Sequence, residues 1–133
     1  MKRYLLALAA LVTLAAGAVT AVTHALCTSA GASVPSAISF VTGQKYQSNP
    51  SPTTDWNLDE ATSGKGFACL KFSMTAPQFY MYNYTAVPGA SFSATAAGDL
   101  DGNGTSSLFT LNGAITANSL YVSPNLIELN PEE

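Results

Sequence analysis

A series of short apolar–polar segments, separated by turn-forming residues, occupies residues 66–111. Strand side chains alternate between two faces, and Pro and Gly interrupt strand ladders, so this series is typical of an antiparallel meander. The segments predicted to be strands are Phe67–Met74, Gln78–Ala86, Ala90–Gly98 and Ser106–Leu111. We therefore expect a mainly β fold, an antiparallel meander sheet of about four strands.

Apolar and aromatic side chains are concentrated in the first two predicted strands. One face of Phe67–Met74 is entirely apolar and consists of Ala68, Leu70, Phe72 and Met74. Gln78–Ala86 carries bulky groups on both faces, and its aromatic row consists of Phe79, Tyr80, Tyr82 and Tyr84. Such rows usually fill half-buried sheet faces, but tyrosine is also enriched in subunit interfaces. Sheet packing is the first interpretation of the row, and an interface is the second.

Shorter elements are predicted on both sides of this series. Ser33–Val41 has the pattern of a short strand, and a turn of helix is predicted beside Trp56. Trp56 is expected to be a partly buried anchor of its loop, with ligand stacking as the alternative. Ser119–Ser123 and Leu126–Leu129 are predicted to be two further strands.

Three motifs follow one another in the second half of the chain: CLKFSM, QFYMYNYTA and FSATAAGDLDGNGTSSLFTL, with a proline between the first two. Together they resemble the globular head of a type IV pilin, most closely pilins of deltaproteobacteria. In that family the aromatic strand is followed by a hairpin tip of the form A-x-G-D-L-D-G-x-G, here Ala96–Gly104, and by S-x-x-x-L on the return. The resemblance implies a pilin-head-like sheet preceded by a long N-terminal loop.

The N-terminal residues combine a basic start with a long apolar run. Lys2 and Arg3 precede Tyr4–Leu26, which is rich in Ala and Leu. A signal peptide needs a basic start, an apolar core and a small-residue cleavage site, whereas about 20 apolar residues also suffice for a membrane-spanning helix. Both interpretations stay open, and the signal peptide is favoured.

The cleavage site decides the domain boundary. Cleavage after Ala25 makes residues 1–25 a leader and residues 26–133 a single pilin-head-like domain, and cleavage as late as Ala32 is also compatible with the sequence. Roughly a hundred residues are an ordinary size for one domain. If the apolar helix is retained, the fold class becomes α+β.

The start of the chain departs from that of an ordinary pilin. A prepilin has a basic leader ending in Gly, then Phe-Thr-Leu-like residues and a Glu at the fifth mature position. Here no Gly-Phe pair precedes the apolar run and no Glu lies within it. The chain is therefore similar to the head subunit of the split pilins of metal-reducing deltaproteobacteria, in which a short helical pilin and a separately secreted head join in the periplasm.

This resemblance implies a structural subunit of a type IV pilus or pseudopilus. Its partners would be a short helical pilin and neighbouring copies of itself in a filament. It would be exported, first to the periplasm and then to an extracellular fibre or the cell surface, with membrane contact only through the leader or the partner helix. The expected interface residues are Leu70, Phe72, Met74, Phe79, Tyr80, Tyr82 and Tyr84.

Charge and cysteine content agree with an exported protein. Without the leader, three cations (Lys45, Lys65 and Lys71) remain against eight carboxylates. Nucleic-acid binding requires a basic surface, so this partner class is excluded. Cys27 and Cys69 suit an oxidising compartment, and they can pair only if cleavage leaves Cys27 in the chain.

The predicted hairpin tip also matches the start of a calcium-binding loop. Asp99, Asp101 and Asn103 occupy the alternating positions of D-x-[DN]-x-[DN]-G, but position twelve is Thr110 instead of a bidentate Glu. Asp, Asn and Gly also suit a tight connection for conformational reasons alone. We expect a hairpin tip first, and a weak calcium site as the second interpretation.

The sequence offers little for catalysis. Its one histidine, His24, lies in or beside the leader, so no Ser-His or Cys-His pair and no zinc-type cluster is expected in the mature chain. Asp55, Asp59 and Glu60 are predicted to be solvated loop residues. We therefore expect a non-enzymatic protein without a cofactor. The alternative function is a secreted monomeric binding module that uses the acidic hairpin for calcium or the aromatic row for glycan.

Overall fold

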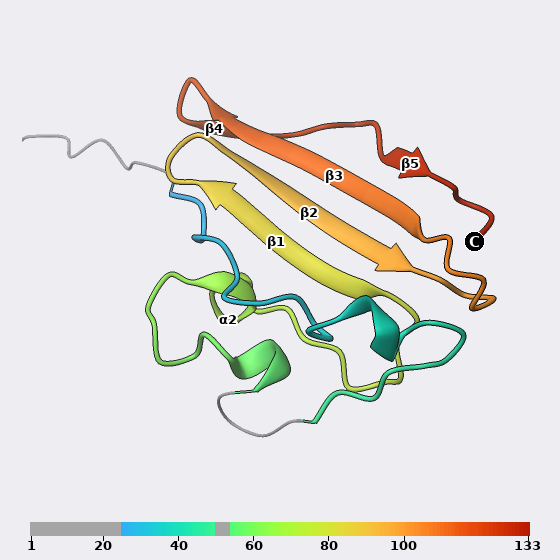
Figure 1. Ribbon diagram of the computed structural model, residues 1–133. Helices are drawn as coiled ribbons and strands as arrows, with labels where there is room; N and C mark the ends of the chain where they lie inside the picture. The colour runs from blue at the N-terminus through green and yellow to red at the C-terminus, as the bar shows by residue number, and fades with distance from the viewer. Residues whose placement is uncertain (1–24, 50–53) are drawn as a thin grey trace, which may run out of the picture.

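One antiparallel sheet dominates the computed structural model, which describes residues 25–49 and 54–133 (Figure 1). Its strands are β1 (Met81–Val87), β2 (Ser91–Gly98), β3 (Ser107–Thr116), β4 (Ser119–Val122) and β5 (Ile127–Leu129). The order is β1-β2-β3-β4, and β5 also pairs with β3. The predicted mainly β, antiparallel fold is confirmed.

The register explains why β3 has two neighbours on its outer side. β2 pairs with β3 along its whole length and with β1 from Ser91 to Ala97. The last part of β3 pairs with β4, and its first part pairs with β5, so β4 and β5 share one edge of the sheet. β3 runs to Thr116, five residues beyond the predicted end at Leu111.

Residues 25–49 and 54–80 form a layer of loops and short helices on the β1 side of the sheet (Figure 1). The helices are η1 (Ile38–Phe40), η2 (Asp55–Asn57) and α2 (Gly66–Leu70). None of the helices in the described part of the chain is long and apolar enough to cross a membrane. Residues 1–24, which contain nearly all of the predicted leader, lie outside the described residues.

The N-terminal arm, residues 27–34, covers the outer edge of β1. The backbone N–H of Ala30 donates to Tyr84 O at 2.9 Å, and Val34 exchanges two hydrogen bonds with Tyr82. These bonds satisfy backbone groups that would otherwise remain open at an edge strand.

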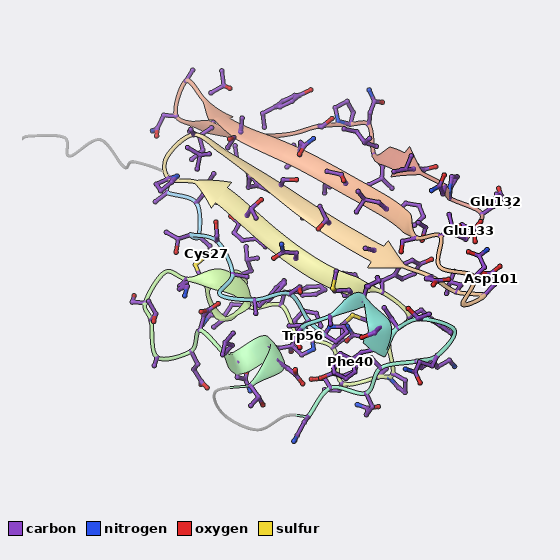
Figure 2. The ribbon with its side chains drawn as sticks, in the orientation of Figure 1. Cys27, Phe40, Trp56, Asp101, Glu132 and Glu133 are labelled. Carbon is purple, nitrogen blue, oxygen red and sulfur yellow. A yellow bond between two sulfur atoms is a disulfide. The ribbon has the colours of Figure 1, made fainter. Side chains whose placement is uncertain are left out.

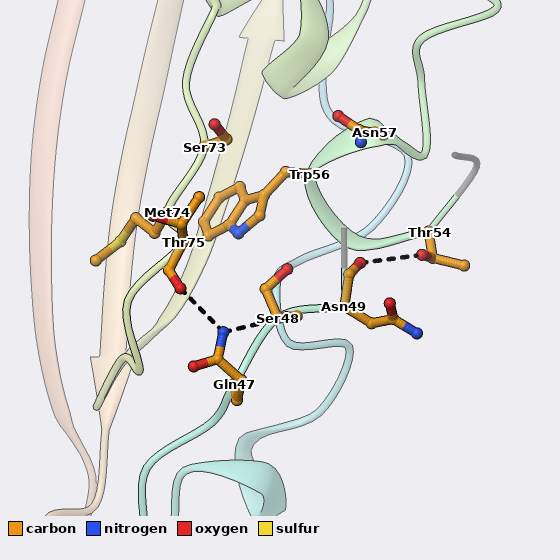
Figure 3. Close-up of a pocket in the computed structure, with 9 residues that line it drawn as sticks. All are labelled: Gln47, Ser48, Asn49, Thr54, Trp56, Asn57, Ser73, Met74 and Thr75. Carbon is orange, nitrogen blue, oxygen red and sulfur yellow. Dashed lines mark hydrogen bonds between the residues drawn. The ribbon is translucent and has the colours of Figure 1, made fainter. Parts of the chain in front are cut away.

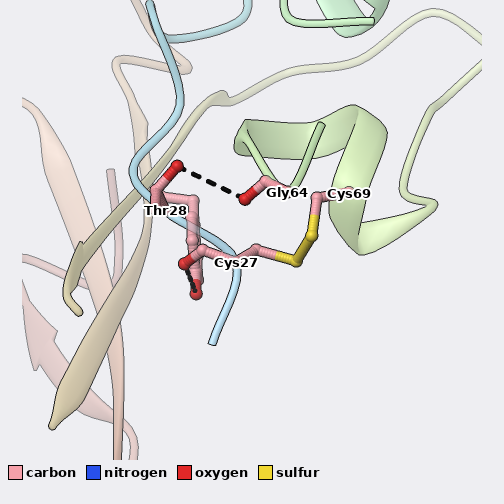
Figure 4. Close-up of a disulfide and its surroundings, with 5 residues drawn as sticks. Cys27, Thr28, Gly64 and Cys69 are labelled. Carbon is pink, nitrogen blue, oxygen red and sulfur yellow. Dashed lines mark hydrogen bonds between the residues drawn. A yellow bond between two sulfur atoms is a disulfide. The ribbon is translucent and has the colours of Figure 1, made fainter. Parts of the chain in front are cut away.

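A disulfide ties this arm to α2 (Figure 4). Cys27 and Cys69 have Cα atoms 5.8 Å apart and lie 42 residues apart in the sequence. Next to it, Thr28 accepts a backbone hydrogen bond from Gly66 and donates one to Gly64. The predicted Cys27–Cys69 pairing is confirmed.

Two predicted strands are wrong. Phe67–Met74 holds most of α2, which ends at Leu70 and is followed by Lys71 with φ +56°, and Ser33–Val41 contains η1. After α2 the Phe72 N–H reaches back to Phe67 O, and the two rings lie 6.2 Å apart. This is a Schellman-type helix end with its hydrophobic contact.

The core lies between this layer, residues 25–49 and 54–80, and the β1–β2 half of the sheet. Its buried hydrophobic cluster consists of Val34, Trp56, Phe67 and Tyr84. Trp56 lies below the sheet in Figure 2, is 5% exposed, and meets the Phe67 ring edge-on at 4.8 Å. The predicted anchoring role of Trp56 is confirmed.

Two loop carboxylates are buried or bonded, so the prediction that they are solvated is wrong. Asp59 is 6% exposed, pairs with Lys65 Nζ at 2.9 Å, and accepts the Gly31 N–H at 2.7 Å. Asp55 accepts hydrogen bonds from Tyr46 Oη, Ser48 Oγ and the Asn49 N–H. Burial, and then the bond to Asp55, raises the pKa of Tyr46 to about 12. Glu60 is exposed, as predicted.

Candidate partner-binding surface

The sheet presents one continuous apolar face. Directly paired residues of antiparallel strands share a face, so the register aligns Tyr82 with Ala96 and Phe109, and Tyr84 with Ala94 and Leu111. The pairing of β3 with β4 extends this face to Leu120 and Val122. Tyrosine rings therefore stand on β1, alanines lie along β2, and large apolar residues follow on β3 and β4.

An apolar hollow of about 310 Å³ lies on this face between α2 and the sheet. Its lining includes Phe67, Leu70, Phe72, Tyr82, Tyr84 and Ala94. Leu70 and Phe72, which line it, are 39% and 43% exposed. Burial raises the pKa of Tyr82 and of Tyr84, so both rings stay neutral at physiological pH.

The face remains open beyond the hollow, because the layer of residues 25–49 and 54–80 lies on the β1 side (Figure 1). Leu120 is 57% exposed and Val122 is 43% exposed on β4, while Leu111 and Ile115 on β3 are half-buried. We call the combined surface the apolar strip. It consists of Leu70, Phe72, Tyr82, Ala94, Ala96, Phe109, Leu111, Ile115, Leu120 and Val122. Large exposed apolar patches of this kind usually mark interaction sites.

The residues expected at an interface do not form one row. Leu70, Phe72, Tyr82 and Tyr84 all line the apolar hollow. The other three, Met74, Phe79 and Tyr80, do not line this hollow. Lys45 Nζ sits 4.8 Å from the centre of the Phe79 ring, and Met74 packs against the core.

Tyr80 closes one end of the strip. A Cβ on Gly98 would lie 2.7 Å from the Tyr80 ring, and this ring meets Phe109 edge-on at 5.8 Å. The β4 residues of the strip were not predicted as interface residues. Their place in the strip depends on the pairing of β4 with β3, and the sequence does not show which strand pairs with β3.

The predicted calcium ligands instead organise their own loop. Asp99 is 2% exposed, and its two oxygens accept the N–H groups of Gly102 and Gly104. Asp101 accepts two hydrogen bonds from Asn103, and Asn103 Oδ1 accepts the Thr105 N–H. Within the described ranges, no group of three His, Cys, Asp or Glu side chains could hold a metal. The hairpin interpretation accounts for these residues, and the calcium site stays a prediction.

Negative charge gathers beside this loop. Figure 2 shows Asp101, Glu132 and Glu133 together at one end of the sheet, where the β2–β3 connection meets the C-terminus. Asn103 Nδ2 donates to Glu133 Oε2 at 3.0 Å and joins the two segments. The acidic end and the uncharged strip are therefore separate surfaces.

Comparison with known proteins adds no assignment: no protein-family model matches the sequence, and no curated protein or solved structure matches it significantly.

Proposed function

We propose that this protein is the head subunit of a type IV pilus or pseudopilus, and that a short helical pilin lies along its apolar strip. The observation that carries the proposal is the strip itself, a partly open apolar surface beside a disulfide-linked layer, with Glu128 of β5 as a charged neighbour paired with Phe109. The motifs that resemble pilin heads support the same role. The role is structural and requires neither a catalytic group nor a cofactor.

The dimensions of the strip suit an α-helix. β2 has eight residues, so the strip is about 26 Å long at about 3.3 Å per residue. The distance across the sheet from β1 to β3 is two strand spacings, or roughly 10 Å. This is about the diameter of a helix with its side chains. Ala94 and Ala96 of β2 provide a low floor between the β1 tyrosines and the β3 side chains, and Phe92 precedes them on the same face of β2.

A helix from another chain fits the described structure, in which the longest helix, α2, has only five residues. Burying the strip would contribute about 25 cal/mol for each Å² of apolar surface removed from water. Neighbouring copies in a filament would then contact the remaining surface of the head. The disulfide supports export to the periplasm and beyond, where oxidising conditions keep such bonds intact.

Co-purification tests this proposal. The full chain is expressed with the short prepilin encoded beside it, the one with the Phe-Thr-Leu and Glu signature, and the head is purified through a tag on that prepilin. Ala94→Leu fills the hollow, and Ser93→Leu places the same side chain on the opposite face of β2. We expect Ala94→Leu to reduce co-purification about tenfold or more, which corresponds to about 1.4 kcal/mol of binding energy.

Ser93→Leu is the matched control and should leave co-purification unchanged. Thermal melts of both variants test whether unfolding causes any loss of co-purification. We expect Ala94→Leu to stay folded, because the hollow has room for the larger side chain. The proposal is contradicted if no such prepilin is encoded beside this chain, or if both variants co-purify as well as the unmodified head.

A further inference from the structure

A second, smaller hollow lies on the other side of Trp56 (Figure 3). We call it the polar pocket. Its lining consists of Gln47, Ser48, Asn49, Thr54, Trp56, Asn57, Ser73, Met74 and Thr75, and its volume is about 160 Å³. Three of these side chains are amides, four are hydroxyls and none is charged. The polar pocket shares no lining residue with the apolar hollow on the strip.

Trp56 presents a hydrogen-bond donor without an acceptor at this pocket. Its side chain is 5% exposed, and Nε1 has no hydrogen-bond partner in the described part of the chain. Figure 3 shows the indole nitrogen on the side of the ring that faces Ser48 and Asn49. Buried indole N–H groups usually have a partner, so a ligand oxygen would complete an interaction that the fold leaves open.

The walls of the pocket are held in place before any ligand binds. Gln47 Nε2 donates to Thr75 O at 3.0 Å and to Ser48 O at 3.2 Å, which connects the two sides. The Trp56 ring is fixed by edge-on contacts with Phe67 at 4.8 Å and Phe72 at 5.3 Å. A preformed site of this kind loses little conformational freedom on binding.

We propose that the polar pocket binds a neutral, hydroxyl-rich ligand the size of one sugar ring, such as the terminal monosaccharide of a glycan. Amide and hydroxyl side chains pair with sugar hydroxyls, and the Trp56 and Met74 side chains offer apolar surface to the C–H groups of the ring. The lack of charged groups selects against acidic sugars. The volume is below the roughly 300 Å³ at which pockets for drug-sized ligands begin, so a single ring is the suitable size.

The site can be followed directly, because the sequence contains one tryptophan. The full chain is titrated with the methyl glycosides of galactose, glucose, mannose and N-acetylglucosamine while Trp56 fluorescence is recorded. At least one glycoside is expected to give a saturable change with a dissociation constant of about 1–10 mM, in the range expected for so small a ligand. The proposal is wrong if none of the four gives a saturable change.

Variants connect the signal to the pocket. Asn57→Ala and Asn49→Ala remove lining amides and should weaken binding about fivefold to tenfold. Asn125→Ala is the matched control, because this exposed amide lies on the β4–β5 connection and should not affect binding. Equal affinity in all three variants would overturn the proposal. Ala94→Leu, the variant of the strip, should leave the titration unchanged, so this result is independent of the proposed pilin role.

Discussion

At the scale of single residues, Asp59 is the clearest case of a charge with a structural role. Burial raises its pKa, but the Gly31 N–H and Lys65 more than offset that effect and hold the pKa below its usual value. The carboxylate fits because neither neighbouring glycine has a side chain. A Cβ on Gly31 would lie 2.7 Å from Asp59 Oδ1, and a Cβ on Gly66 would collide with Oδ2.

A lowered pKa makes the stability depend on pH in a defined direction. The contribution of Asp59 is complete above about 3.9, the unfolded pKa, and is lost as pH falls through the lower folded pKa. Asp59→Asn should lower the free energy of unfolding at pH 7 by about 1–3 kcal/mol, and this deficit should shrink in acid. Urea denaturation at several pH values measures it. Glu60→Gln, an exposed neighbour, is the control, and parallel pH profiles of Asp59→Asn and the unmodified chain would contradict the assignment.

The hairpin tip allows a ranking of four substitutions. Gly104 has φ +89° with open space around it, so Gly104→Val is penalised by backbone conformation alone. Asp99→Asn should cost about 1–3 kcal/mol because its amide NH2 would face one of the two backbone N–H donors that buried Asp99 now accepts, whereas exposed Asp101→Asn should cost little. Gly102, with φ +75°, should behave like Gly104.

Thermal melts in calcium and in chelator measure this ranking and test the second interpretation of the loop together. The melting temperatures should not depend on calcium at physiological concentration. A large loss of melting temperature in chelator, abolished by Asp99→Asn, would show instead that the loop is a metal site.

At the scale of elements, the disulfide is the strongest tie between the arm and α2. It closes a loop of 42 residues, for which the chain-entropy model gives about 4 kcal/mol of stabilisation. The double variant Cys27→Ser/Cys69→Ser should lose stability by this order, and urea denaturation of the unmodified chain with and without reductant should show the same difference. An unchanged midpoint in reductant would contradict it.

The predictability of the elements depends on the range of the interactions that form them. The strands of the second half were predicted because turn residues and alternation are local signals, as at Pro88–Gly89 between β1 and β2. The helix α2 was not predicted within Phe67–Met74, because short apolar runs cannot be assigned to helix or strand by periodicity alone. There the left-handed Lys71, the distant Cys27 and the contact of Phe72 with Phe67 select a helix.

The same distinction applies to the candidate surface. Leu70, Phe72 and the tyrosines were recognised as interface candidates because their residue types are informative in sequence. Leu120 and Val122 were not, and neither was the Trp56 pocket, whose walls come from three separate segments, residues 47–49, 54–57 and 73–75. Buried Asp59 was missed for a similar reason, since Gly31 lies 28 residues before it.

At the scale of the whole molecule, the fold is asymmetric. A layer of loops and short helices covers the β1 side of the sheet, while the apolar face of β3 and β4 is open (Figure 1). Asp101, Glu132 and Glu133 gather at one end of the sheet, and Glu128 of β5 pairs with Phe109 at the margin of this face. The central claim is that the open face is completed by a helix from another chain.

Hydrogen exchange of the full-length head, alone and in complex with the short prepilin, measures this claim most directly. The account predicts slower exchange on complex formation in Phe67–Phe72 and Ser119–Val122, on the two sides of the apolar strip, and unchanged exchange in Asp99–Thr105, the acidic hairpin. Unchanged exchange on both sides of the strip, or protection confined to the acidic hairpin, would contradict it.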